Sequence, residues 1–282
     1  MNRSVIFGGA LLGVIALIAI LAPLLGTGDP ARIDPTERNR RPGAEQRVRG
    51  DDGRARSVVH WMGTDSLGRD VYTRVVYGAR VSLLVGVTVA LISAAAGLVI
   101  GLLAGYLRWL DAPVMRVMDG LMSIPAILLA IGLVTLSRAG LRTVIVAIVI
   151  PEVPRVTRLV RSVVLSLREE PYVEAATALG ARTPALLRRH ILPNTLAPLI
   201  VQATFVCASA ILVEAILSFL GVGIPPETPT WGNIMAEGRA LFRIFPHNIL
   251  FPGVFLAITV LAVNMLGDGL RDTLDPRVRK RL

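Results

Sequence analysis

The feature that most constrains the fold of this chain is a series of apolar runs long enough to cross a lipid bilayer. The first run covers residues 5–25. At about 1.5 Å of rise per residue, a helix of this length crosses a hydrocarbon core of ~30 Å. The chain has 282 residues, a mean hydropathy of +0.63 and only 18% charged residues, too little charge to cover a soluble domain of this size. These properties indicate an integral membrane protein.

Five further apolar segments follow the first, at residues 81–107, 121–136, 141–153, 196–222 and 249–270. The segments at 121–136 and 141–153 are short, and Pro125, Pro151 and Pro154 bend or end them. The pattern predicts an all-α membrane protein with six transmembrane helices and both termini on one side. A secretory signal peptide is the alternative for the first run, but its apolar region would be about 7–15 residues long and no A-x-A site closes this run. We therefore expect a retained membrane helix.

Arginines between the apolar segments predict the orientation. Short cytoplasmic loops of membrane proteins carry an excess of Lys and Arg. The loop between the fourth and fifth segments carries Arg155, Arg158, Arg161, Arg168, Arg182, Arg188 and Arg189, and the tail carries Arg271, Arg277, Arg279, Lys280 and Arg281. Both are therefore expected in the cytoplasm, together with both termini. Residues 26–80 are expected outside, because this long segment approaches the ~60-residue limit of the rule and its acids nearly match its arginines.

Composition divides this extracytoplasmic segment into two parts. Residues 29–57 combine prolines, glycines and both charge signs, which predicts a poorly ordered surface loop. Residues 63–80 are expected to be ordered, with Asp70 or Thr64 as the cap of the next helix. Asp65 and Asp70 flank a glycine-bearing stretch, where acids are more often caps than catalysts.

The sequence lacks the residues of several enzymatic sites. A Walker A loop needs a lysine to reach the phosphates, and Lys280, near the C-terminus, is the only lysine. The chain is therefore not expected to be a P-loop ATPase. His60, His190 and His247 are scattered and Cys207 is the single cysteine, so neither a metal site nor an internal disulfide is expected. We predict that the chain is not an enzyme.

A polar stretch between the fourth and fifth segments, YVEAATALGARTPALLRRHILPN at 172–194, has the pattern of a helix, a glycine break and a second helix. Residues 169–179 are good helix formers with acids near their start. Gly180 is expected to stop that helix in a left-handed turn. Thr183 is expected to cap a second helix with Pro184 at its first position, and Pro193 to end it. The first helix lacks the broad apolar face of an interfacial helix, so its small alanines suit contact with another protein.

Four stretches of the sequence resemble one family. EAATALG, with Leu-Pro twelve residues after its glycine, resembles the EAA loop of binding-protein-dependent ABC import permeases. GTDSLGRDVYTRVVYGARVSL (63–83), LSFLGVGIPPETPTWGNIM (217–235) and NMLGDGLRDTLDPR (264–277) are similar to its peptide-transporter branch. The family resembled is the C-type permease subunit of dipeptide and oligopeptide ABC importers. His190 departs from the usual apolar residue of the general pattern, and the N-terminal MNRS is shorter than the tail of most relatives.

This resemblance implies a type I ABC importer permease fold. Residues 1–79 would hold the N-terminal helix and an extracytoplasmic segment, 80–270 the permease core with a cytoplasmic coupling loop at about 155–195, and 271–282 a cytoplasmic tail. The residues implied to couple to an ATPase are Glu174, Ala175, Ala176, Gly180, Leu192 and Pro193. The implied partners are a paralogous permease, two ATPase subunits that bind ATP and Mg, and an extracytoplasmic binding protein. The cargo would be a peptide, with nickel or glutathione as alternatives, and the location the bacterial inner membrane.

Glu214 is the carboxylate placed well inside a predicted span, about 12 Å from its outer end. A carboxylate at that depth is costly unless it is paired, protonated or in contact with water. We expect Glu214 to be buried with a polar partner, from this chain or the paralogous permease. It would either form a packing hydrogen bond between helices or line the translocation cavity and meet the peptide.

Two other classes of membrane protein remain as alternatives. An ion-coupled secondary transporter often shows inverted repeats and several intramembrane charges, whereas this sequence shows no evident repeat. An insertase-like or structural membrane protein would not need the helix–glycine–helix stretch. Dependence of transport on a separate ATPase distinguishes the three classes.

Overall fold

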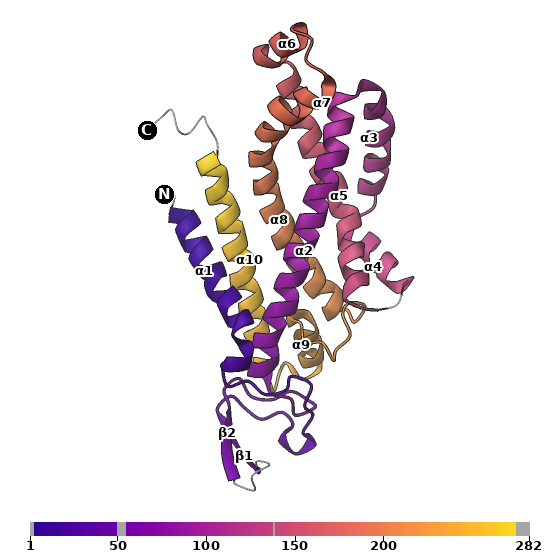
Figure 1. Cartoon of the computed structure of the whole chain (residues 1–282). Coiled ribbons are helices and arrows are strands. Elements are labelled where there is room, and N and C mark those ends of the chain that lie inside the picture. The colour runs from indigo at the N-terminus through magenta and orange to yellow at the C-terminus, as the bar shows by residue number, and fades with distance from the viewer. Residues whose placement is uncertain (1–2, 50–54, 138, 275–282) are drawn as a thin grey trace.

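The computed structural model describes residues 3–49, 55–137 and 139–274. Four long helices dominate it: α1 (Arg3–Ile20), α2 (Val71–Tyr106), α8 (Leu192–Phe219) and α10 (His247–Leu274). α1 packs against α10, whereas α2 packs against α8 and α5 (Leu141–Arg168). The molecule is elongated, with α6 (Pro171–Ala178) at one end and a β-hairpin at the other (Figure 1). The first residues of α1 and the last of α10 both point toward the α6 end (Figure 1).

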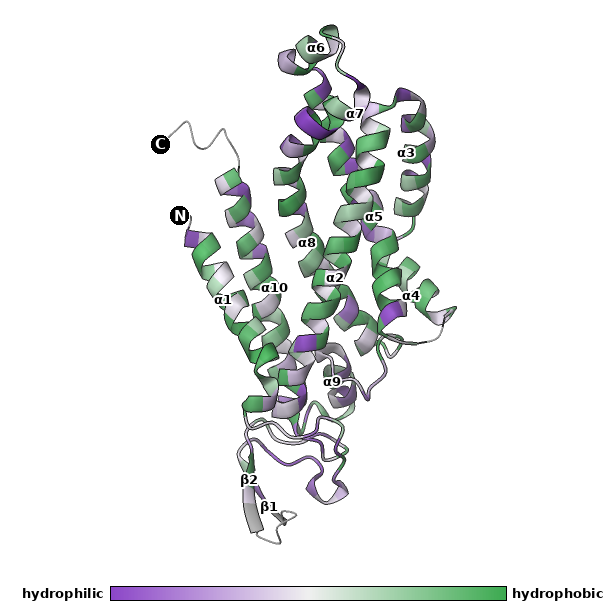
Figure 2. Ribbon diagram, in the orientation of Figure 1, coloured by the Kyte–Doolittle hydropathy of each residue, from purple (hydrophilic) through white to green (hydrophobic). Residues whose placement is uncertain are grey.

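Four helical stretches are long and apolar enough to cross a membrane: Arg3–Ile20, Val71–Tyr106, Thr183–Phe219 and His247–Leu274. The pair α3 (Arg108–Met122) and α4 (Ala126–Thr135) also passes this test but is bent by 82°, which gives up to five spans. Pro125 lies at the bend and has no amide hydrogen to continue the first helix. Figure 2 shows hydrophobic residues along the long helices and more hydrophilic ones in the loops at the hairpin end.

The remaining predicted span corresponds to α5, which is longer than expected. It has 28 residues and continues through Pro151 and Pro154 to Arg168. Its charged residues make α5 less apolar than the four long helices. The predicted span ended at residue 153, whereas the helix continues to Arg168, so residues 155–168 of the predicted loop are helical and pack along α2.

Glycines make this close packing of α2 and α5 possible. Three glycines of α2, one turn apart, face three valines of α5: Gly97 meets Val156, Gly101 meets Val160 and Gly105 meets Val164. A Cβ added at these glycines would lie 2.6, 2.7 and 2.8 Å from the respective valine Cβ, well inside van der Waals contact. Small residues let membrane helices approach closely, and this contact stabilises α5 beyond its prolines. The main apolar cluster of the protein lies around it, among α2, α4, α5 and α8.

The segment between α1 and α2 is more ordered than predicted. Within residues 29–57, the short helix η2 (Pro35–Glu37) and the strands β1 (Ala44–Arg49) and β2 (Ala55–His60) form, and the strands pair antiparallel. The Asn39 amide donates to the Asp65 carbonyl at 3.0 Å, and the Arg40 amide donates to Thr64 Oγ1 at 2.8 Å. These bonds to the following turn replace the partners that a disordered chain finds in water. Residues 50–54 of the predicted loop lie outside the described residues.

The start of α2 is capped as predicted by Asp70. Its side chain accepts a hydrogen bond from the Thr73 amide at 2.7 Å, which satisfies one free donor of the first turn. The alternative cap, Thr64, is buried and binds the Arg40 amide instead. His60, at the end of β2, lies 2.8 Å from the Asp70 carboxylate, so the hairpin is tied to the start of α2.

Candidate coupling site

The helix–glycine–helix stretch forms a projecting elbow at the end of the molecule (Figure 1). Its first helix, α6, ends in a left-handed turn at Gly180, whose φ is +84° as the sequence predicted. The Ala181 amide donates to the Ala176 carbonyl at 3.1 Å, and the Gly180 amide donates to the Thr177 carbonyl at 2.9 Å. This pair of bonds is the Schellman motif, which satisfies the last carbonyls of a helix and fixes the direction of the chain after it.

The second helix differs from the prediction at both ends. The short helix α7 (Thr183–Leu186) begins after Arg182, and no side chain caps it, so Thr183 is not its cap. Pro193 does not end the helix, because the chain passes through a π-helical segment, η3 (Leu187–Ile191), directly into α8. The wider π-turn bonds the Leu192 amide to the Leu187 carbonyl, and Pro193 falls in the first turn of α8, where its missing donor is tolerated.

The elbow presents an exposed tip on a buried base. Val173 and Leu186 are buried and hold it to the helices below. Leu179 at the tip is 89% exposed, although an isolated leucine gains from burial. Of the six residues implied to couple to an ATPase, Glu174, Ala175, Gly180 and Pro193 are exposed, and Ala176 and Leu192 are half-buried. Leu192 and Pro193 lie at the start of α8, below the tip.

Polar contacts join the base of the elbow to the neighbouring helices. Arg168, at the end of α5, donates to the Gly105 carbonyl at 3.0 Å and lies over the Tyr106 ring at 5.6 Å. His190, the departure from the family pattern, lies 6.1 Å from the ring of Tyr172 in α6. Burial raises the pKa of the Tyr172 hydroxyl, and the Glu170 carboxylate acts in the same direction. The ring of His190 therefore contacts Tyr172 of the elbow, at a position where the family pattern usually has an apolar residue.

The structure places Glu214 inside the helical body, far from the elbow. Its side chain is 0% exposed. Ser218 Oγ donates to one carboxylate oxygen at 2.8 Å, and Ser82 Oγ of α2 donates to the other at 3.2 Å. Its polar partners therefore come from this chain, and it faces other helices rather than lipid.

A second buried carboxylate, Glu152 of α5, was missed by the sequence reasoning. It is 2% exposed, accepts a hydrogen bond from Ser209 Oγ of α8 at 3.0 Å and lies 3.2 Å from Arg155. The predicted span ended at residue 153, which placed Glu152 at a helix end. The valines at 156, 160 and 164 continue a one-turn repeat past Pro154, and that repeat could have extended the helix.

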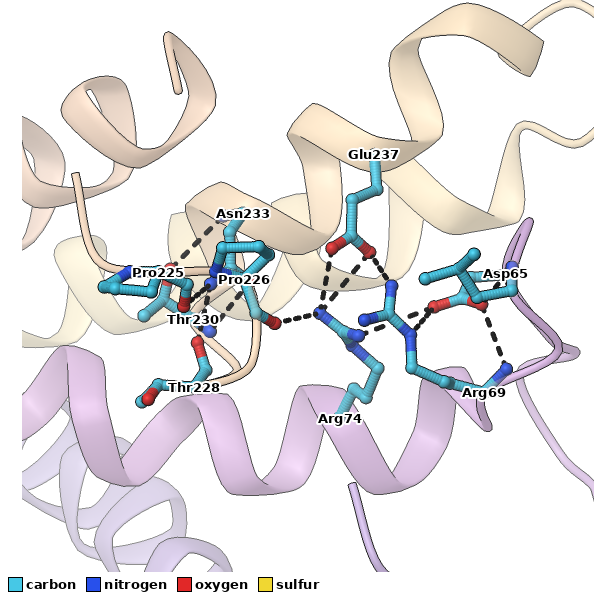
Figure 3. A network of polar contacts seen from close by, with 10 residues as sticks. Asp65, Arg69, Arg74, Pro225, Pro226, Thr228, Thr230, Asn233 and Glu237 are labelled. Carbon is cyan, nitrogen blue, oxygen red and sulfur yellow. Dashed lines mark hydrogen bonds and ion pairs between the residues drawn. The ribbon is translucent and has the colours of Figure 1, made fainter. Parts of the chain in front are cut away.

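Two of the stretches with family resemblance meet at the hairpin end of α2, where Arg74 Nη2 donates to the Pro226 carbonyl at 3.4 Å (Figure 3). Arg69 Nε binds the Asp65 carboxylate at 2.7 Å, and Arg74 lies 3.6 Å from the same carboxylate. Both guanidinium groups also contact Glu237 of α9 (Trp231–Gly238). Burial raises the pKa of the Glu237 carboxyl, and the charges of Arg74 and Arg69 oppose that rise. Glu237 lies two residues after the 217–235 stretch, and this ion cluster holds α9 against α2.

Comparison with known proteins identifies the family of this chain. A family model described as "Binding-protein-dependent transport system inner membrane component" matches residues 97–280. The chain is 54% identical over 277 residues, 98% of its length and 90% of the relative's, to "Probable peptide ABC transporter permease protein y4tQ" of Sinorhizobium fredii. It is 44% identical to a dipeptide transport system permease protein of Alkalihalophilus pseudofirmus, covering 99% of this chain and 87% of the relative. A glutathione transport system permease protein of Escherichia coli is 46% identical over 79% of this chain and 74% of its own.

Solved structures show the same fold. A methionine ABC transporter in an inward-facing conformation matches with a TM-score of 0.51 and 23% identity, covering 69% of this chain and 94% of the matched chain. An amino acid ABC transporter matches with a TM-score of 0.56 and 13% identity, covering 72% and 94% respectively. The helical body is thus that of a type I ABC importer permease. The extent of the family match and the near full-length relatives show that this chain belongs to the family of binding-protein-dependent transport system inner membrane components.

Proposed function

We propose that this chain is the permease subunit of an ATP-driven importer and forms the pathway for di- or oligopeptides delivered by a binding protein. The observation that carries the proposal is the elbow, which projects from the helical body and continues through η3 into α8. A force applied to α6 would therefore reach a helix that crosses the membrane. Near full-length relatives named for peptide and dipeptide transport favour a peptide cargo. The glutathione transporter relative makes glutathione the second candidate, and nickel rests on the sequence resemblance alone.

The elbow would dock into a separate ATPase subunit. Glu174, Ala175, Ala176 and Gly180 would form the contact, with Leu179 at its centre, because close approach needs small side chains around one apolar anchor. Leu192 and Pro193 would carry the motion into α8. ATP and Mg would be bound by two such ATPases, and this chain would have no catalytic role. Their closure would shift the membrane helices between inward- and outward-facing states.

The complete transporter would contain this chain, a paralogous permease, two ATPases and an extracytoplasmic binding protein, in the bacterial inner membrane. The α6 end and both termini would face the cytoplasm, and the hairpin end would face outward. The arginines near α6 support this orientation, since positive charge is enriched on the cytoplasmic side. The coupling loop, expected at about 155–195, would begin near residue 169, because α5 continues to Arg168. The tail residues 275–282 lie outside the described residues.

A left-handed glycine in the elbow gives a direct test. Gly180→Val forces a β-branched residue into φ +84°, which costs about 1–3 kcal/mol locally and redirects the second helix. We expect ATP-dependent peptide uptake and ATPase co-purification to fall, while membrane insertion persists. Glu174→Arg, which reverses a charge at the proposed contact, should have the same effect.

Gly26→Val is the matched control, because Gly26 has a φ of +70° and open space around it but lies at the opposite end of the molecule. Normal uptake and normal ATPase co-purification in both elbow variants would contradict the coupling assignment. Uptake that proceeds without any ATPase would favour an ion-coupled transporter instead.

A further inference from the structure

A cleft of about 690 Å³ lies between α5, α8 and α10. Its lining includes Leu159 of α5, Asn194, Pro198, Gln202 and Phe205 of α8, and Arg271 of α10. Asn194, Pro198 and Gln202 recur every four residues, so they share one face of α8. The cleft begins near the start of α8 and the end of α10, at the elbow side of the molecule, and runs toward Phe205.

A charged pair lies beyond the inner end of this cleft. Ser209 is one turn past Phe205 on the same face of α8, and its hydroxyl donates to Glu152 of α5 at 3.0 Å. Arg155 is one turn before Leu159 on α5, and its Nη1 donates to both oxygens of Glu152 at 3.2 Å. The Arg155 side chain is nonetheless 49% exposed in this chain. The cleft thus runs from the elbow side toward an arginine whose side chain is half exposed.

Arg155 lies deep in the membrane-spanning body. The next residue, Val156, packs on Gly97 of α2. Gly97 is ten residues before Leu107, or about 15 Å along the helix from the end of the predicted span. A half-exposed guanidinium at this depth is costly against lipid, so such groups face a water-filled cavity or another protein chain.

The hydrogen bonds of Arg155 leave donors free. A guanidinium carries five N–H donors, and among the described residues Arg155 bonds through Nη1 alone. Arg158, one turn further, also has an exposed side chain but donates through Nη2 to Asp119 at 2.6 Å. The two arginines therefore differ in their partners: Arg158 is bonded to Asp119 of the neighbouring helix α3, whereas Arg155 is bonded to Glu152 of its own helix and lies on the face of α5 that carries Leu159.

We propose that Arg155 faces the translocation pathway and binds the carboxylate of the passing peptide. A guanidinium binds a carboxylate through two parallel hydrogen bonds, which suits the C-terminus or an acidic side chain of the cargo. Glu152 is a positioning residue, because it is held by Ser209 and binds Nη1 of the guanidinium. It also balances the charge, which keeps cargo binding weak enough for release. This inference rests on the proposed peptide import.

Cysteine accessibility tests the first half of the inference. Cys207 is the single cysteine, so Cys207→Ser provides a background without reactive thiols in this chain. In that background, Arg155→Cys in the assembled transporter should react with a water-soluble charged methanethiosulfonate, read as a mass shift of this chain, and excess peptide should slow the reaction. Val146→Cys, on the apolar surface of α5 and 56% exposed, is the control that should not react. An unreactive Arg155→Cys, with and without ATP, would overturn the proposal by showing that another chain covers it.

Cargo charge tests the second half. Proteoliposomes holding the full transporter and loaded binding protein would take up a peptide with a free C-terminal carboxylate or its C-terminal amide. Arg155→Gln should lower the initial rate for the carboxylate form about tenfold, as for loss of a hydrogen bond to a charged group, and change the amide rate much less. Arg155→Lys should recover part of the loss, and Arg158→Gln should change neither rate.

The possible failures are distinguishable. ATP hydrolysis stimulated by the loaded binding protein should persist in Arg155→Gln, because the elbow is intact. Absence of ATP-dependent uptake in the unmodified transporter would refute the proposed function itself. Normal uptake with equal rates for both cargo forms in Arg155→Gln, or equal loss of both, would refute the carboxylate site alone.

Discussion

Replacing Gly101 with alanine tests whether the contact of α2 with α5 stabilises the helical body. The added Cβ would lie 2.7 Å from the Val160 Cβ and 2.8 Å from the Thr157 carbonyl oxygen. Carbon atoms in ordinary contact lie about 3.5–4.0 Å apart, so the helices would have to separate by roughly 1 Å. Such overpacking costs about 1–3 kcal/mol. Alanine also gains about 1 kcal/mol in helix propensity over glycine, and this gain must be removed by a control.

Gly120→Ala supplies that control, because Gly120 lies inside α3 with open space around it. The free energy of unfolding of each variant would be measured in mixed micelles. Gly101→Ala should be less stable than Gly120→Ala by about 1–3 kcal/mol, since the propensity gain is common to both. Adding Val160→Ala, which removes a Cγ1 2.9 Å from the new Cβ, should recover part of the loss. Equal stability of the two single variants would refute the packing argument.

Three further predictions concern the hairpin end. Trypsin added from the hairpin side of the membrane should cut within residues 47–56 and spare Arg40, whose amide is bonded to Thr64. Cleavage that occurs only when trypsin reaches the opposite side of the membrane would show that the proposed orientation of the chain is inverted. Hydrogen bonds from Thr36 lower the pKa of Asp34 below 3.8 in the folded protein. The contribution of Asp34 to stability is therefore present above pH 3.8 and is lost as the pH falls through the pKa of the folded state. Pepsin should cut residues 29–46 faster at lower pH, and Asp34→Asn should weaken this pH dependence. Glu237→Gln should lower the free energy of unfolding by about 3 kcal/mol, because Asp65 would be the one carboxylate left to pair with Arg69 and Arg74 in this cluster. Glu227→Gln, at an exposed position, is the control and should have little effect in the same thermal unfolding assay.

Local signals account for the parts of the fold that the sequence predicted. The long helices follow from runs of apolar residues, and Asp70 and Gly180 act on hydrogen bonds within four or five residues of themselves. The elbow was therefore predictable in its first helix and its turn. Family resemblance, rather than composition, is the basis for proposing which of its residues contact an ATPase.

Long-range contacts account for the parts that were not predicted. Pro154 ends a helix by local rules, but α5 continues because its valines fill the space left by the glycines of α2. Residues 29–49 have the composition of a disordered loop, yet the turn at 64–65 supplies partners for their amides. Glu152 was not recognised as a buried site because its role depends on α5 extending past residue 153 and on Ser209 of another helix. In each case the deciding partner is distant in sequence.

Glu214 provides the last prediction, since its two candidate roles respond differently to two substitutions. Its carboxylate accepts hydrogen bonds from Ser82 of α2 and Ser218 of α8 and is fully buried. Glutamine keeps one acceptor and adds a donor, and a serine hydroxyl can rotate to accept it, so Glu214→Gln should retain both bonds and most uptake. Leucine leaves two buried hydroxyls without this partner, at about 1–3 kcal/mol each, so Glu214→Leu should assemble poorly and lose uptake. If Glu214→Gln abolishes peptide uptake while the transporter assembles and hydrolyses ATP normally, the charge itself is needed and a packing role is refuted.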